Sequence, residues 1–143
     1  MKKIQAGVIG ASGYAGAELV RLLWNHPMVE VSGISSKSYT GQKISDLYPG
    51  FYQICDMVFQ DEDSVIAASD VVFASLPHGL SEKLARKCFD ADKIFIDLGA
   101  DFRLDKEEDY AMWYGLDYHD PALHKESVYG LPEIYSACPQ IRL

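Results

Sequence analysis

The residues best suited to chemistry stand near the amino terminus, in Gly-Ala-Ser-Gly-Tyr-Ala-Gly at residues 10–16. This GxxGxxG spacing follows a short apolar run and opens an amphipathic one, as a dinucleotide-binding loop requires. Gly10 permits a tight turn, Gly13 lets the backbone approach a pyrophosphate, and Gly16 allows close packing of helix and strand. Amides at the start of the next helix then face the phosphates. The alternative is a glycine-rich turn that binds no nucleotide.

The end of the second apolar run is expected to select the nucleotide. An NAD site usually places Asp or Glu there to hold the ribose 2′-hydroxyl. This chain has Ser35, Ser36 and Lys37 instead. Two hydroxyls can donate to a 2′-phosphate and a lysine can neutralise it, so the segment predicts NADP as the cofactor. The alternative is a solvated polar loop.

Four short, almost continuously apolar runs are typical of strands buried on both faces of a parallel sheet. They occupy residues 4–9, 29–34, 71–76 and 94–98. Helical patterns lie between them, at residues 15–25, 64–69 and 80–89. On the first helix, the side chains that we expect to be buried are Ala15, Leu19, Leu22 and Leu23. On the third helix they are Leu80, Leu84 and Phe89. Pro27 should end the first helix, and Ser81 is a candidate cap for the third.

Strands that alternate with helices predict a doubly wound, Rossmann-like α/β fold with a mostly parallel sheet. At 143 residues the chain is expected to form one NADP-binding domain over residues 1–143. Residues 99–143 are less regular, and we expect loops and short elements laid over the end of the sheet. From residue 136 onward a divergent tail is expected.

Composition narrows the classes of partner. The chain has 13 Lys and Arg against 21 Asp and Glu, a net charge of −8, so it has no general attraction for nucleic acid or anionic membranes. Cys55, Cys88 and Cys138 form no CxxC pair, and the four histidines complete no metal-ligand spacing. We therefore expect reduced thiols, a cytoplasmic location and no metal site. The apolar run near Met1 is too short for a signal peptide or a membrane span.

Further motifs follow the third and fourth predicted strands, where ligands sit in a doubly wound sheet. They are Leu-Pro-His-Gly at residues 76–79, Ala-Asp-Phe-Arg at 100–103 and Tyr-Gly-Leu-Pro-Glu at 129–133. With the glycine loop, residues 1 to 135 resemble the amino-terminal half of the N-acetyl-gamma-glutamyl-phosphate reductase family, NADPH-dependent oxidoreductases of arginine biosynthesis. Aspartate-semialdehyde dehydrogenases share the loop but do not usually carry the three other motifs together.

The resemblance implies a role for each matching residue. The residues that would hold the pyrophosphate are Gly10, Ser12, Gly13, Tyr14, Ala15 and Gly16. The residues near the 2′-phosphate would be Ser35, Ser36 and Lys37. The residues beside the nicotinamide would be Leu76, Pro77 and His78. Arg103 would grip an anionic substrate through its guanidinium fork. The alternatives are that His78 caps the next helix and that Arg103 forms a structural ion pair with Asp97 or Asp101. Family members often have Ser at the position of Gly99.

The family's chemistry is attack of a cysteine thiolate on an acyl phosphate, followed by reduction of the thioester by NADPH. Its Asn-Pro-Gly-Cys-Tyr-Pro-Thr segment does not occur in the 143 residues, and Cys138 comes too early and lacks those neighbours. We therefore expect a cofactor-binding portion without catalytic residues, which binds NADP(H) but does not reduce the acyl phosphate alone. The second, catalytic and dimerising domain would be absent, and the full-length enzyme is expected to be a homo-oligomer.

Three other functions share parts of this pattern. The chain could be a fragment similar to aspartate-semialdehyde dehydrogenase, or a non-catalytic NADP-binding module. A sugar-nucleotide epimerase or a short-chain reductase would share the glycine loop and would also need a Tyr-x-x-x-Lys pair.

Overall fold

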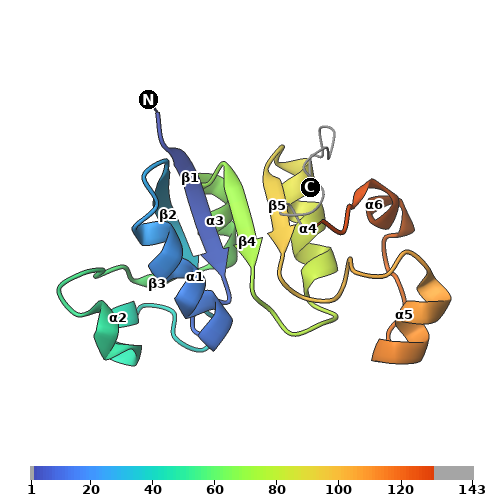
Figure 1. The fold of residues 1–143 in the computed structure, drawn as a ribbon, viewed down its shortest axis with the longest axis horizontal. Helices are drawn as coiled ribbons and strands as arrows, with labels where there is room; N and C mark the ends of the chain where they lie inside the picture. Colours follow the sequence, from blue (N-terminus) through green and yellow to red (C-terminus); the bar gives the residue numbers. More distant parts are fainter. Residues whose placement is uncertain (1, 131–143) are drawn as a thin grey trace.

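The computed structural model describes residues 2–130 and contains a five-stranded, all-parallel sheet of order β3-β2-β1-β4-β5 (Figure 1). The strands are β1 (Ile4–Ile9), β2 (Val29–Ser35), β3 (Phe59–Gln60), β4 (Val71–Ala74) and β5 (Ile94–Asp97). The predicted doubly wound fold and its four strands are confirmed. The two-residue β3 was missed because so short a run carries no periodic signal.

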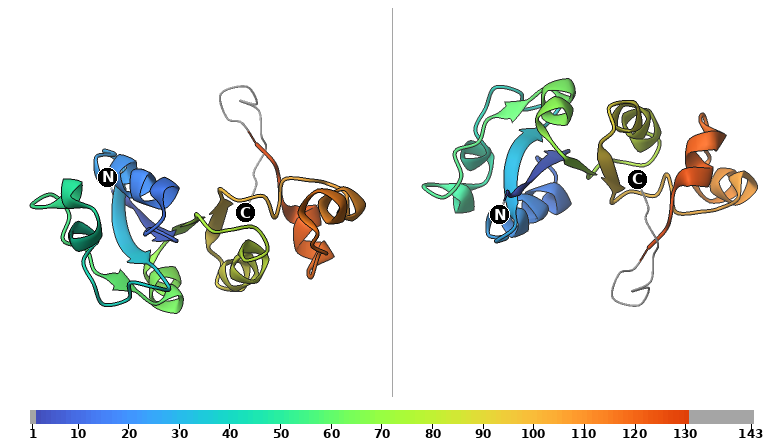
Figure 2. Two further views of the ribbon diagram at one scale, coloured as in Figure 1. Left: turned by 90° about the horizontal axis from the view of Figure 1, so that it is seen from below. Right: turned by 90° about the horizontal axis from the view of Figure 1, so that it is seen from above.

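The helices are α1 (Tyr14–Trp24), α2 (Ile44–Leu47), α3 (Glu62–Ala68), α4 (Ser81–Asp90), α5 (Glu107–Tyr114) and α6 (Pro121–Glu126), with a 3₁₀ turn at Pro49–Phe51. Figure 2 shows α1 on one face of the sheet and α3 and α4 on the other. From β1 the chain runs outward to β2 and β3, then returns across the sheet to β4, so the strand order reverses between β1 and β4. Within residues 2–130, no helix is long and apolar enough to span a membrane.

The core has one apolar layer on each side of the sheet. Val8 in β1 belongs to the layer that includes Val20 of α1, whereas its neighbour Ile9 belongs to the layer with Val65 of α3 and Leu84 of α4. Successive side chains of a strand point to opposite faces. Both faces of β1 are covered, which explains why its sequence is almost continuously apolar.

The predicted buried faces of α1 and α4 were partly wrong. Helix α1 buries Gly16, Ala17 and Val20, whereas Ala15 and Leu22 are exposed. Helix α4 buries Ser81, Leu84, Ala85 and Cys88, whereas Leu80 and Phe89 are exposed. The pattern of large side chains misled the prediction, because both helices make their closest approach through small residues.

Helices α5 and α6 lie beyond β5 and beside α4, not over the end of the sheet as predicted (Figures 1 and 2). One carboxylate holds this region to α4. Glu82 accepts hydrogen bonds from the backbone amides of His119 and Asp120 and contacts the His124 ring at 3.1 Å. Arg86 of α4 adds an ion pair with Asp120 at 2.9 Å.

The amino terminus of α4 is held by a residue from outside the helix. Its N-cap is Leu80, so Ser81 is not the cap that we predicted. Asp101, only 1% exposed, accepts hydrogen bonds from the amides of Gly79 (2.6 Å) and Ser81 (2.8 Å) and from the Tyr110 hydroxyl (2.9 Å). This carboxylate satisfies amides that a helix start otherwise leaves unpaired. It thereby ties the β5–α5 loop to the β4–α4 loop.

No described helix covers the α1 side of β4 and β5 (Figure 1). Ile94, Ile96 and Leu98 alternate along this segment and are 46%, 40% and 44% exposed. Their neighbour Phe95 points to the other face and is buried against α4. The described residues therefore leave an apolar sheet face open.

Substitution Asp101→Asn should lower the free energy of unfolding by about 1–3 kcal/mol. The substitution replaces one carboxylate oxygen by an NH₂ group, which cannot accept a hydrogen bond from the buried amide and hydroxyl donors that face it. Chemical denaturation monitored by circular dichroism measures this change. Asp105→Asn, at an exposed position of the same loop, is the matched control and should stay within about 0.5 kcal/mol of wild type. Equal effects of the two substitutions would show that the Asp101 hydrogen bonds do not stabilise the fold.

Candidate functional site

A cleft of about 610 Å³ opens at the carboxyl ends of β1, β2 and β4, where the strand order reverses. Ligands of open α/β sheets bind at this position. The predicted residues that the cleft brings together are Gly10, Ser12, Gly13, Ser35, Ser36, Lys37, Leu76 and Pro77. Tyr14, Ala15, Gly16, His78 and Arg103 do not line it. The cleft is within the size range of small-molecule and cofactor sites.

The three glycines of the loop serve different needs. Gly10 has φ +82°, and a Cβ there would lie 2.2 Å from the Ser75 carbonyl oxygen at the end of β4. A Cβ on Gly16 would lie 2.2 Å from the Gly10 carbonyl oxygen, so this glycine lets α1 pack on the loop itself. At Gly13 a Cβ would meet only the Gly10 oxygen, at an ordinary 3.5 Å. The protein's own packing therefore does not require glycine at position 13. A ligand that approaches the backbone at this position closely would require it, because a side chain would stand in the way.

Several amides of the loop are already engaged. Those of Gly10 and Ala11 donate to the Ser35 carbonyl at 3.2 and 3.0 Å, and that of Gly13 donates to Gly10. Ala17 makes the first helical bond, to the Gly13 carbonyl at 2.8 Å. The amides of Tyr14, Ala15 and Gly16 precede that bond and have no intrahelical acceptor. They can bind an anion through the backbone alone, which agrees with a Tyr14 side chain that is 89% exposed.

Of the three residues predicted to select the nucleotide, Ser35 and Ser36 are buried and Lys37 is exposed. The alternative of a solvated polar loop therefore fits Lys37 and the exposed Ser38 but not the two buried serines. The Ser36 and Ser12 hydroxyls form a hydrogen bond of 2.7 Å, and Tyr48 donates to the Ser12 carbonyl. One hydroxyl of the pair must donate to the other, so the pair retains one free O–H for a ligand.

Three charged residues that line the cleft were missed by the sequence analysis. They are Glu62 at the start of α3 and Lys83 and Lys87 on α4. The spacing of the two lysines, one helical turn apart, could have indicated that they share a face of α4. Lys87 pairs with Asp63 at 2.7 Å, and this hydrogen bond raises the pKa of Lys87.

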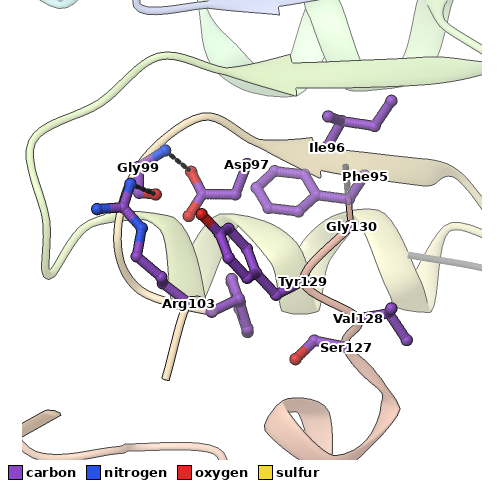
Figure 3. A pocket seen from close by; sticks show the side chains of 10 residues that line it. Phe95, Ile96, Asp97, Gly99, Arg103, Ser127, Val128, Tyr129 and Gly130 are labelled. Carbon is purple, nitrogen blue, oxygen red and sulfur yellow. Dashed lines mark hydrogen bonds between the residues drawn. The ribbon is translucent and has the colours of Figure 1, made fainter. Parts of the chain in front are cut away.

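Arg103 lies in a separate cavity of about 240 Å³ with Asp97, Gly99 and Tyr129 (Figure 3). Its guanidinium donates to the Gly99 carbonyl at 3.2 Å and contacts the Tyr114 hydroxyl at 3.5 Å. Within residues 2–130, Arg103 forms no ion pair with Asp97 or Asp101, so the structural alternative was wrong there. Its positive charge nevertheless acts on Asp97, where it lowers the pKa of the carboxyl group against the larger effect of burial.

Asp97 is bound from two sides in this cavity. Its Oδ1 accepts from the Ser81 hydroxyl and the Gly99 amide, at 2.8 and 2.9 Å, whereas Oδ2 is buried without a partner among the described residues. Burial raises the pKa of this carboxyl group. A Cβ at Gly99 would lie 3.2 Å from Oδ2, so the serine common in the resembling family would stand beside the unpartnered oxygen.

His78 does not cap α4, because the N-cap is Leu80 and the amides at that end donate to Asp101. Its ring packs against Tyr114 with 5.4 Å between centroids. The role of His78 beside the nicotinamide stays a prediction. So does the binding role of Arg103.

The described thiols are unsuited to nucleophilic chemistry. Cys55 and Cys88 are both buried, and burial raises the pKa of Cys55 and raises that of Cys88 to about 12. Neither lines the cleft. Cys138, the tail from residue 136 and the Leu-Pro-Glu part of the motif at 129–133 lie outside the described residues.

One Tyr-x-x-x-Lys spacing exists, at Tyr39 and Lys43. The Tyr39 ring packs near Phe59, and Lys43 pairs with Asp56 at 3.5 Å. Neither residue lines the cleft, so the pair is not placed as a short-chain reductase would need it.

Comparison with known proteins agrees with this architecture. Residues 5–139 match the family described as "Semialdehyde dehydrogenase, NAD binding domain". The N-acetyl-gamma-glutamyl-phosphate reductase of Brachyspira hyodysenteriae is 54% identical over 131 residues, and that of Pseudomonas aeruginosa is 46% identical over 135. Each alignment covers 92% of this chain, which spans only 37–39% of the length of these relatives.

Among solved structures, the aspartate semialdehyde dehydrogenase of Candida albicans with NADP aligns with a TM-score of 0.63 and 24% identity, over 74% of this chain and 32% of that one. The Vibrio cholerae aspartate semialdehyde dehydrogenase II aligns with a TM-score of 0.59 and 20% identity, over 73% and 30%. At this identity the likeness supports the fold alone. The family match covers nearly the whole chain, and the protein therefore belongs to the semialdehyde dehydrogenase NAD-binding domain family.

Proposed function

We propose that this chain is the NADP(H)-binding part of an oxidoreductase that reduces N-acetyl-gamma-glutamyl phosphate to its semialdehyde. The observation that carries the proposal is the glycine at position 13, which the protein's own packing does not require and which opens onto a cleft of cofactor size. The names of the relatives, at about half identity over most of this chain, support the substrate.

Each group of residues then has a defined task. The first-turn amides of α1 bind the pyrophosphate, with Gly13 leaving room for it. Ser35, Ser36 and Lys37 lie at the 2′-phosphate. Leu76 and Pro77 border the nicotinamide half, with His78 next to them in the chain. When bound, the reduced cofactor supplies a hydride.

Arg103 binds an anionic group of the substrate. Its guanidinium is held by the Gly99 carbonyl and the Tyr114 hydroxyl, so it is oriented before a ligand arrives. We assign the covalent step of the family's chemistry to none of the described residues. We also propose that the whole enzyme is a cytoplasmic homo-oligomer; the reduced, buried thiols support the location.

Isothermal titration calorimetry of the purified chain tests the cofactor. NADPH should bind at least about tenfold more tightly than NADH, because only NADPH carries the phosphate that Lys37 can neutralise. A preference for NADH would overturn the assignment of Ser35, Ser36 and Lys37. Absence of binding by either nucleotide would overturn the proposed function.

A pair of glycine substitutions separates binding from folding. Gly13→Ala should change the free energy of unfolding by no more than about 1 kcal/mol, yet reduce NADPH affinity about tenfold or more, because the new methyl group points where the pyrophosphate binds. Gly16→Ala should instead destabilise the fold by about 1–3 kcal/mol, since its Cβ would clash with the Gly10 carbonyl. Chemical denaturation and calorimetry measure the two quantities. Unchanged NADPH binding by a folded Gly13→Ala variant would contradict the proposed loop function.

A further inference from the structure

The cleft differs in charge from the rest of the molecule. The chain as a whole carries −8, yet the charged residues that line the cleft are three lysines and one carboxylate, namely Lys37, Lys83, Lys87 and Glu62. A local excess of cations in an acidic protein favours an anionic ligand there.

The four charges do not act equally. Lys87 is paired with Asp63 at 2.7 Å, so its charge is already compensated. Within residues 2–130, Lys37 and Lys83 form no ion pair, and both side chains are exposed. The carboxylate of Glu62 also acts on Lys87, since it contributes to the raised pKa of that lysine. Lys37 and Lys83 are therefore the two cations of the lining that no carboxylate pairs with in residues 2–130.

Hydroxyl groups cannot replace this charge. Ser35 and Ser36 are buried, and the hydrogen bond between Ser36 and Ser12 leaves one O–H for a ligand. Ser38 and Ser75 also line the cleft, but a phosphate group with nearly two negative charges needs cations as well as neutral hydroxyl donors. The two uncompensated lysines come from different elements, Lys37 from the segment after β2 and Lys83 from the first turn of α4.

We propose that Lys83 is a second cation for the 2′-phosphate of NADP(H), which it contacts from the α4 wall of the cleft while Lys37 contacts it from the β2 end. The inference rests on the proposed function and adds a specificity-determining residue to it. Lysine suits the task, because its flexible four-carbon stem lets an exposed side chain follow a phosphate across an open cleft.

The substitution Lys83→Gln tests the inference in the full chain. Calorimetry with 2′,5′-ADP and 5′-AMP isolates the 2′-phosphate, and NADPH and NADH repeat the comparison with whole cofactors. Affinity for 2′,5′-ADP and NADPH should fall about tenfold, and affinity for 5′-AMP and NADH should change less than about twofold. Lys83→Arg, which keeps the charge, should retain most of the preference for the phosphorylated ligands.

Lys125→Gln is the matched control, because it removes the same charge from an exposed lysine of α6 outside the cleft. It should leave the affinities for all four ligands unchanged, and thermal unfolding confirms that each variant is folded. A wild-type preference for NADPH that persists in Lys83→Gln would overturn the role of Lys83 and leave the proposed function intact. Equal losses for NADPH and NADH would also overturn it, since the contact would then not be to the 2′-phosphate. A wild-type chain without any preference would overturn both.

Discussion

The close approach of backbone to backbone at the glycine loop is the constraint on which the rest of the site depends. A methyl group at Gly10 would lie 2.2 Å from the end of β4, and one at Gly16 would lie 2.2 Å from the loop's own carbonyl. These contacts bring the start of α1 against the ends of β1 and β4, where the strand order reverses. The cleft opens beside this junction, and the unpaired amides of the first turn of α1 are where we propose that a diphosphate binds.

A second link joins the cofactor region to the region of Arg103. Asp101 receives the amides of Gly79 and Ser81 and the hydroxyl of Tyr110, and Asp97 receives the Ser81 hydroxyl. Two carboxylates thus hold the amino terminus of α4 between the cleft and the second cavity. Movement of one loop is resisted by hydrogen bonds to the other, which suits a site where two ligands must meet in a fixed geometry.

Much of the fold and part of the site could be predicted from sequence, and the differences have physical causes. The strands and the glycine loop were predicted because apolar runs and GxxGxxG spacing are local signals. Lys83 and Glu62 were missed because only tertiary structure brings charged residues of α4 and α3 to the cleft. The same reason explains Asp101, a remote cap for α4 that lies twenty residues beyond Ser81. The buried face of α1 was misassigned because close packing favoured Gly16 and Ala17 over larger residues.

The open sheet face at Ile94, Ile96 and Leu98 affects how this chain behaves in solution. In the described sheet β5 is an edge strand. The backbone groups on its outer side and its apolar side chains are therefore both exposed to other molecules. Repulsion between copies that each carry −8 opposes their contact. Salt screens that repulsion but does not weaken apolar attraction, so we expect any association of copies through this face to strengthen as ionic strength rises.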